Sequence, residues 1–376
     1  MAEGSPNGSL TRWIEKRFNI TEIFSFLTSF GLFPTELDTR KPVREAVSEA
    51  LSRPVLSYAR WPRVLGIISF LLFVFLGITG LMLAFYYQPT PSDAYSSVTV
   101  IVRDVSFGWF VHQVHGWAAT MFLLVLLIRL WRFYFQGLYK SPREALWIVA
   151  ILTFLAATHA DMTGRLLGWN DQGYWTSLRA VELLYSLPVL GPLFGFLIGG
   201  SNLGSLVLVR FYFLHVAVLP AIILAFFFLH FSGVRRLGLS AAGEALESGG
   251  PRYRVYLYNL LILIVLVFGT LISLAILAPA VYQSPANPFS TPPGARPPWY
   301  LLASHGFIES FPAFVPRWMR AFLLEGILLV SILVPFIDRR SASESGRRWL
   351  AKLVGAGVLA GWLVFTWIGY RLEAGP

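Results

Sequence analysis

Seven apolar stretches, each close to the length that crosses a lipid bilayer, constrain this chain more than any other feature. They cover residues 64–87, 109–135, 145–160, 206–232, 255–280, 318–337 and 349–370, and the third is expected to extend from Glu144 to about Asp161. About 20 apolar residues cross the hydrocarbon core as a helix, and a backbone in lipid must satisfy its own hydrogen bonds. The sequence therefore predicts an all-α fold, a polytopic membrane bundle of about seven transmembrane helices.

The distribution of charge indicates how this bundle is oriented. The net charge is +10, and 22 of the 30 Lys and Arg residues fall in alternate connections, at 1–63, 129–143, 233–254 and 339–352. Basic residues mark the cytoplasmic side of a membrane protein, so orientation explains the charge and a nucleic-acid partner does not. The first sixty residues are polar and basic, without a signal-peptide pattern. We expect an integral protein of a bacterial or archaeal cytoplasmic membrane with its N-terminus in the cytoplasm.

Breaks in the apolar pattern divide the chain into four segments. Residues 1–63 form a cytoplasmic extension in which Leu10–Phe33 is amphipathic and 34–62 is a polar loop or extension with several prolines. A four-helix domain follows at 64–232, then a cytoplasmic linker at 233–254 and a three-helix domain at 255–376. The long connections 161–205 and 281–317 lie on the non-cytoplasmic side, where loops of this length are usually functional or docking surfaces.

Two histidines occupy matching depths on two parallel helices of the four-helix part. His115 precedes Arg132 by 17 positions and His215 precedes Arg235 by 20. At about 1.5 Å per residue, both imidazoles lie roughly 25–30 Å from the basic ends, near the non-cytoplasmic face. Two neutral imidazoles that face each other across a bundle can hold a haem iron. Two hydrogen-bonded structural histidines are the alternative, although ionisable residues within membranes are usually functional.

Cysteine is absent from the sequence. This chain therefore has no residue for a disulfide, for thiolate ligation of an iron–sulfur cluster or for thioether attachment of a c-type haem. Any such centre must belong to a partner protein.

Four sequence blocks, in order and on the expected spans, resemble the cytochrome b/b6 family of quinol–cytochrome oxidoreductase complexes. They are "GLMLAFYYQPTPSDAYSSV" at 80–98, "FGWFVHQVHGWAATM" at 107–121, "KSPREALW" at 140–147 and "VRFYFLHVAVLPAIILAFFFLHF" at 209–231. The later "SPANPFSTP" at 284–292 and "PPWYLL" at 297–302 resemble subunit IV of b6f complexes. The chain thus resembles a divergent fusion of cytochrome b6 with subunit IV.

This resemblance implies a set of haem-binding residues. His115 and His215 would ligate haem b on the non-cytoplasmic side, while Gly66, Gly80 and Gly164 would let haem planes approach the backbone. Ordinary packing of small residues between helices is the alternative for the glycines. Arg132 and Arg210 match family arginines and are expected to contact haem propionates or to serve the structure.

The residues of a second haem site depart from the family pattern. His230 matches one of its ligands, but Arg129 stands where the other is expected, and Ala150 replaces a glycine. A guanidinium stays protonated and is a poor iron ligand. Three arrangements are consistent with these changes: the haem is absent, with Arg129 filling its volume or reaching the interface; it is five-coordinate on His230; or another side chain replaces the ligand.

The quinol site also departs from the family pattern. Pro298, before Trp299 and Tyr300, replaces the glutamate that the family is thought to use as a proton acceptor. Quinol oxidation releases two protons, so the site needs another base. We expect that base to be His305, or His159 together with Asp161; the alternatives are that these residues are structural or that quinol is not oxidised here.

The resemblance implies a b-type cytochrome subunit that passes electrons between quinol or quinone and haem, with catalysis only in a complex. It also implies a Rieske-type iron–sulfur protein, a c-type cytochrome and a homodimer, with the lipid bilayer as surroundings. Two other functions remain open: a single-haem electron-transfer subunit of another respiratory or photosynthetic complex that does not bifurcate electrons, and a structural anchor subunit without quinol chemistry.

Overall fold

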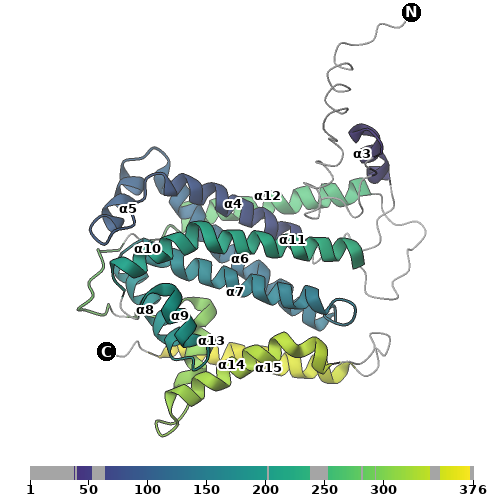
Figure 1. The fold of residues 1–376 in the computed structure, drawn as a ribbon. Helices are drawn as coiled ribbons and strands as arrows, with labels where there is room; N and C mark the ends of the chain where they lie inside the picture. The colour runs from purple at the N-terminus through teal and green to yellow at the C-terminus, as the bar shows by residue number, and fades with distance from the viewer. Residues whose placement is uncertain are drawn as a thin grey trace, which may run out of the picture.

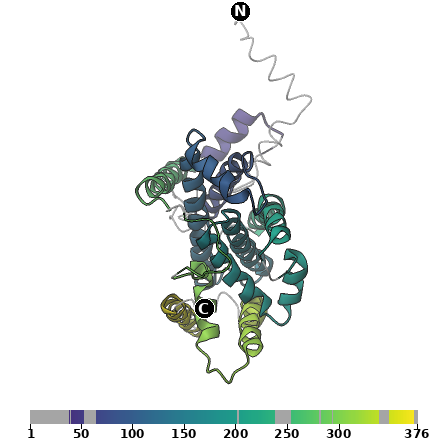
Figure 2. The ribbon, with the colours of Figure 1, turned by 90° about the vertical axis from the view of Figure 1, so that its left-hand side faces the viewer.

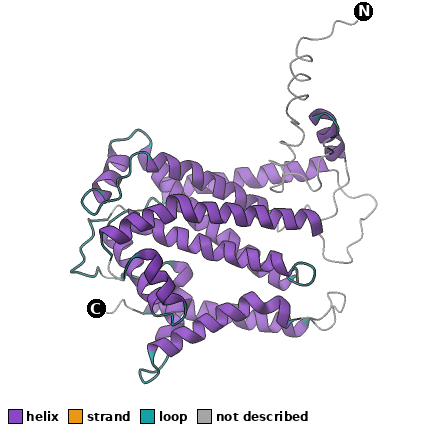
Figure 3. Cartoon of the chain, viewed as in Figure 1, coloured by secondary structure: helices purple, strands orange, loops and turns teal. Residues whose placement is uncertain are grey.

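The computed structural model describes residues 38, 40–52, 64–200, 203–237, 253–280, 283–292, 294–338 and 348–372. In this part of the chain the secondary structure is helical (Figure 3). A single isolated bridge joins Asn170 and Pro285. The amphipathic segment Leu10–Phe33 lies outside the described residues, as does most of the linker at 233–254.

The seven expected membrane spans are present as long helices (Figure 1). The four-helix part contains α4 (Leu65–Ala84), α6 (Gly108–Phe135), α7 (Glu144–Leu167) and a fourth helix made of α10 (Ser205–Phe213), η3 (Leu214–Val218) and α11 (Leu219–Leu237). The remaining spans are α12 (Tyr253–Leu277), α14 (Arg317–Ile337) and α15 (Trp349–Arg371). The third span thus continues to Leu167, several residues beyond its expected end, because Thr163 hydroxyl bonds and the Asp161–Arg165 ion pair turn its polar side chains back onto the helix.

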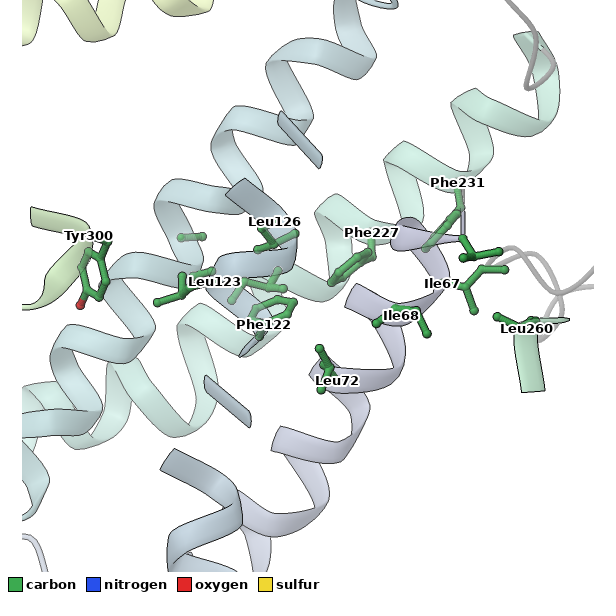
Figure 4. Packing of buried hydrophobic residues seen from close by; sticks show 14 residues of the cluster. Ile67, Ile68, Leu72, Phe122, Leu123, Leu126, Phe227, Phe231, Leu260 and Tyr300 are labelled. Carbon is green, nitrogen blue, oxygen red and sulfur yellow. The ribbon is translucent and has the colours of Figure 1, made fainter. Parts of the chain in front are cut away.

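Apolar side chains from α4, α6, α7 and α11 form the centre of the bundle. Figure 4 shows this cluster running from Tyr300 at one end, past Phe122 and Phe227, to Phe231 at the other. The rings of Phe70, Phe73 and Phe227 pack with centroids 5.4–5.6 Å apart. These contacts fix how the four helices lie against one another and therefore where their polar residues meet.

Short helices occupy connections that the sequence left as loops. Within 34–62, expected to be a polar loop or extension, α3 (Val43–Ser52) forms after Pro42, whose carbonyl accepts hydrogen bonds from Glu45 and Ala46. The connection between the first two spans contains α5 (Ala94–Arg103), and the long connection after α7 contains α8 (Asp171–Tyr185) and α9 (Leu190–Ile198). Asn170 caps α8 through its side chain, which accepts a hydrogen bond from the Gly173 N–H at 2.7 Å.

The C-terminal helices lie against the four-helix part on two sides. Seen along the bundle, α12 lies at one side, next to α6, while α14 and α15 lie at the other, next to α7 and α6 (Figure 2). Between α12 and α14 the chain forms η4 (Trp299–Leu301) and α13 (Leu302–Glu309), which packs on α15. This return places Tyr300 against one end of the central cluster.

Candidate haem and quinol site

His115 of α6 and His215 of η3 face each other across the bundle. Their ring centroids lie 6.2 Å apart, with the ring planes inclined by 73°. His215 lies in a five-residue π-helix, a local widening that occurs often at functional sites. The sequence expectation that the two imidazoles meet at one depth agrees with this geometry.

The hydrogen bonds of the two imidazoles determine which ring nitrogens remain free. The Nδ1 of His215 lies 2.8 Å from the carbonyl oxygen of Ala160, which can only accept, so this Nδ1 carries the hydrogen. The Nδ1 of His115 lies 2.8 Å from the Thr79 hydroxyl, whose own hydrogen is donated to the Phe75 carbonyl at 2.8 Å. Both Nδ1 atoms therefore donate, and both Nε2 lone pairs are left for a metal.

The distance between the rings fits a metal ion held by both. With metal–nitrogen bonds of about 2 Å and a ring nitrogen roughly 1 Å from its centroid, two opposed imidazoles on one ion have centroids about 6 Å apart. Neutral imidazole with a hydrogen-bonded second nitrogen is the usual form of a haem ligand. The donor set, its separation and its outer hydrogen bonds thus fit a haem b whose iron would be held by both histidines.

Glycines make room beside these two rings. A Cβ at Gly80 would lie 3.1 Å from Cε1 of His115, and a Cβ at Gly164 would lie 2.5 Å from Cε1 of His215. The second separation is shorter than real side chains tolerate, so the ring position of His215 depends on the glycine in α7. Two of the three glycines predicted from the sequence, Gly80 and Gly164, lie beside this histidine pair, while Gly66 lies beside Arg129.

The contacts of the two predicted arginines, Arg210 and Arg132, are with residues other than these imidazoles. Arg210 donates to the Phe196 carbonyl at 2.9 Å and so holds the C-terminal end of α9. Arg132 lies in the last turn of α6, within electrostatic range of Arg129. The contacts of Arg210 support the structural role among the two roles that the sequence left open.

The residues of the second predicted haem position also come together, at the opposite end of the bundle. His230 and Arg129 are 5% and 8% exposed, and they lie within electrostatic range of each other. The Arg129 guanidinium lies over Gly66, with Cζ 3.8 Å from where a Cβ would stand. Arg129 is therefore buried inside the bundle and does not extend to the membrane surface.

An ion pair lies near the first histidine site. Arg165 donates through Nε to Asp161 at 2.6 Å, and the Asp161 side chain is 9% exposed. Asp161 lies within electrostatic range of both His215 and Tyr300, and Tyr300 donates its hydroxyl hydrogen to the Thr158 carbonyl at 3.1 Å. Burial, and after it the Asp161 charge, raise the pKa of Tyr300 well above its ordinary value.

The other candidate quinol-site residues have different neighbours. His159 stacks on Phe194 with ring centroids 5.4 Å apart, and its Nδ1 bonds the Leu155 carbonyl, so it does not pair with Asp161. His305 lies among Glu309, Arg179 and Arg317, and burial is the main cause that lowers its pKa. Pro298 and Trp299 begin the turn that positions Tyr300.

Sequence reasoning missed two side chains of the site. Thr79 is a lone polar residue in an apolar span, directly before a glycine already singled out, and that position was the available signal. Arg165 follows Asp161 by four residues, the spacing that places two charges on one helix face. The Ala160 carbonyl carries no such signal, because only the tertiary structure brings it to His215.

Comparisons with known proteins agree with this geometry. Residues 50–238 match the family model "Cytochrome b/b6/petB", and residues 285–376 match "Cytochrome b(C-terminal)/b6/petD". A "Cytochrome bc complex cytochrome b subunit" of Chlorobaculum thiosulfatiphilum is 32% identical over 308 residues, which cover 80% of this chain and 71% of the relative. The chain belongs to the cytochrome b family.

Further similarities extend over both parts of this cytochrome b. A cytochrome b6 of Prochlorococcus marinus strain NATL1A is 34% identical over 206 residues, covering 54% of this chain and 93% of the relative. Among solved structures, a chain of a "Hyperthermophilic respiratory Complex III" superposes with a TM-score of 0.77 at 26% identity, covering 89% of this chain and 90% of the other. Membership of this family implies haem b and an integral membrane location, which the seven apolar helices support.

Proposed function

We propose that this cytochrome b is the quinol-oxidising, haem-carrying subunit of a bc-type complex. The observation that carries the proposal is the pair of facing imidazoles, each with Nδ1 committed to an oxygen acceptor. His115 and His215 would hold the haem, which would accept one of the two electrons of quinol, and the Rieske-type partner proposed below would accept the other. The pair and its outer hydrogen bonds are more than an anchor subunit without electron transfer requires.

The quinol head group is proposed to bind between the haem histidines and the η4 turn. Asp161 lies within electrostatic range of His215 on one side and of Tyr300 on the other. The buried indole nitrogen of Trp299 has no hydrogen-bond partner among the described residues, so it offers a donor to a ligand oxygen. A quinol at this position would meet a carboxylate, an indole N–H and a phenol.

Asp161 is proposed as the first proton acceptor. Its carboxylate is fixed by the 2.6 Å bond from Arg165, so one oxygen is oriented and the other can accept a hydrogen bond from a quinol hydroxyl. Tyr300 cannot serve as this base near neutral pH, because its raised pKa keeps the phenol protonated. His305 is neutral at such pH because its pKa is lowered, which suits a later acceptor on the way to water.

The surroundings of the subunit belong to the same proposal. Relatives named as subunits of a cytochrome bc complex and of a Complex III suggest a Rieske-type iron–sulfur protein and a c-type cytochrome as partners. The asymmetric placement of Lys and Arg supports a cytoplasmic N-terminus in a bacterial or archaeal membrane. A homodimer follows only from the family resemblance.

Rapid mixing of the oxidised complex with quinol tests the chemistry, with haem reduction followed by absorbance. We expect quinol to reduce the haem in the natural protein and Asp161→Asn to slow that reduction about 100-fold, the usual contribution of a positioned base. Asp104→Asn is the matched control, because Asp104 is exposed at the α5–α6 turn, and it should leave the rate unchanged.

Two results would contradict the proposal. A natural complex whose haem quinol does not reduce would exclude quinol oxidation at this subunit. An Asp161→Asn rate equal to that of Asp104→Asn would remove Asp161 as proton acceptor and leave the haem assignment intact.

A further inference from the structure

The helices that hold His115 and His215 carry a second copy of the same site about four turns away. Each component of the first site has a counterpart 14 or 15 residues along its own helix, toward the end with Arg132. The counterparts of Gly80, His115, Ala160, Gly164 and His215 are Gly66, Arg129, Leu146, Ala150 and His230. The second copy keeps one glycine and one histidine, and it replaces the other histidine and the other glycine.

The largest change is the guanidinium of Arg129. At the first site the side chain opposite the α4 glycine is an imidazole, with Cε1 3.1 Å from a Cβ at Gly80; at the second it is the guanidinium, 3.8 Å from a Cβ at Gly66. Arg129 is 8% exposed and donates no hydrogen bond to any described residue. It occupies the place equivalent to that of His115 and could not ligate iron while protonated.

A second change displaces the remaining histidine. A Cβ at Gly164 would lie 2.5 Å from the His215 ring, yet the equivalent position on α7 carries the Cβ of Ala150. His230 therefore cannot take, relative to α7, the position that His215 takes. The Nδ1 of His230 still faces the Leu146 carbonyl, but it makes no close hydrogen bond to any described residue, whereas the equivalent bond of His215 measures 2.8 Å.

Aromatic side chains fill the space around the second copy. Phe133 stands where the first site has Ala119, and its ring centroid lies 6.2 Å from that of His230. Phe231 stands where the first site has Val216, and it packs against Phe227, as Figure 4 shows. A haem would have to displace these rings as well as the guanidinium.

We propose that Arg129 and Ala150 close the second site to haem, so that this chain carries a single haem b, between His115 and His215. The inference rests on the proposed function, because it concerns how many centres the subunit can use. A second centre would lie about 20 Å further along the helices. Without it, the haem exchanges electrons only with groups near its own side of the membrane, and this chain provides no haem relay across the bilayer.

Haem counting on purified complexes tests the inference. Pyridine haemochrome per cytochrome b chain, with haems of partner chains subtracted, should give one haem b for the natural protein. The double variant Arg129→His/Ala150→Gly restores both missing components and should bring the count to two, with a second low-spin signal in the EPR spectrum. Arg129→Leu is the matched control: it removes the charge without supplying a ligand, and its count should remain one.

The outcomes separate this inference from the proposed function. Two haems b in the natural protein would overturn the inference and leave the proposed function standing, whereas no haem b would overturn both. A double variant that keeps the spectrum of the first haem, and so is folded, but still binds only one haem would show that Arg129 and Ala150 are not what closes the site.

Discussion

The four-helix part and the C-terminal part of this cytochrome b are held together by different kinds of contact. In α4, α6 and α7, 28%, 33% and 44% of the most apolar stretch is buried, whereas the share is 11% each in α14, in α15 and in the fourth helix of the four-helix part. Three helices of the four-helix part thus bury more of their apolar surface than the C-terminal helices do, while the fourth helix, α14 and α15 expose most of theirs, as expected for helices that face lipid or partner chains. A substitution in the four-helix part should therefore change haem binding. A substitution in the C-terminal part should instead change how its helices pack against their neighbours.

Glycines show the contrast at the level of single atoms. A Cβ at Gly164 would meet the imidazole of His215, so that glycine makes room for a proposed haem ligand. A Cβ at Gly306 of α13 would overlap the Phe365 carbonyl of α15 and lie 2.7 Å from the Gly369 nitrogen, so that glycine makes room for a backbone. The same residue type serves a cofactor site in one part and helix–helix contact in the other.

Polar contacts at the end of the bundle that carries Arg132 attach the C-terminal part. Trp147 donates to the Ser331 carbonyl at 2.9 Å, and Tyr134 donates to the Ala351 carbonyl at 2.8 Å. Asp338 accepts from Tyr139 at 2.6 Å and pairs with Lys140 at 3.0 Å. None of these contacts involves His115 or His215. Effects on haem content and effects on the attachment of the C-terminal part can therefore be measured separately.

The largest expected effect comes from removing a proposed haem ligand. His215→Ala should abolish haem b binding in the purified complex, because no other imidazole stands opposite His115 at that depth in the described bundle. The loss would be measured as pyridine haemochrome per chain. Arg210→Lys, five residues earlier on the same helix and bonded to α9, is the control and should keep the haem. Retention of a low-spin haem by His215→Ala would mean that another residue is the ligand.

The sequence predicted the long helices well, because apolar runs of bilayer length have few alternatives. It did not predict α8 and α9, since their Gly- and Trp-rich sequence has neither the length of a span nor a strong periodicity. It also missed α3, whose start depends on Pro42 and on an ion pair from Lys41 to Glu49 at 2.7 Å. Short helices depend on such local contacts more than on overall hydropathy.

The site was predictable where it depended on spacing along one helix. His115, His215 and their glycines follow from helical depth and from the family pattern. The partners of Asp161 did not follow, because helix rotation decides that it turns toward Tyr300 while His159 turns toward Phe194. Whether Arg129 points inward or toward the interface likewise depends on how α4 and α11 pack beside it.

A smaller effect is expected from crowding a ligand without removing it. Gly164→Ala should cost about 1–3 kcal/mol, the usual penalty of overpacking, and should weaken haem retention by a corresponding factor of roughly 5 to 160. Gly116→Ala, on α6 beside His115, is the control, because a Cβ there meets nothing within 4 Å. The measurement is haem transfer to apomyoglobin over time. Equal transfer rates for both variants would show that Gly164 does not determine the position of His215.

The smallest effect on haem, and the clearest test of the contrast between the two parts, comes from α13. Gly306→Ala forces α13 and α15 apart, because its Cβ would overlap backbone atoms that have no rotamer to change. We expect a loss of about 1–3 kcal/mol in stability, seen as a lower thermal unfolding midpoint of the complex, with haem content unchanged. Gly361→Ala on α15 is the control, since a Cβ there meets nothing within 4 Å. If Gly306→Ala instead released haem as readily as Gly164→Ala, the C-terminal part would be holding the haem pocket together and the division between the two parts would be wrong.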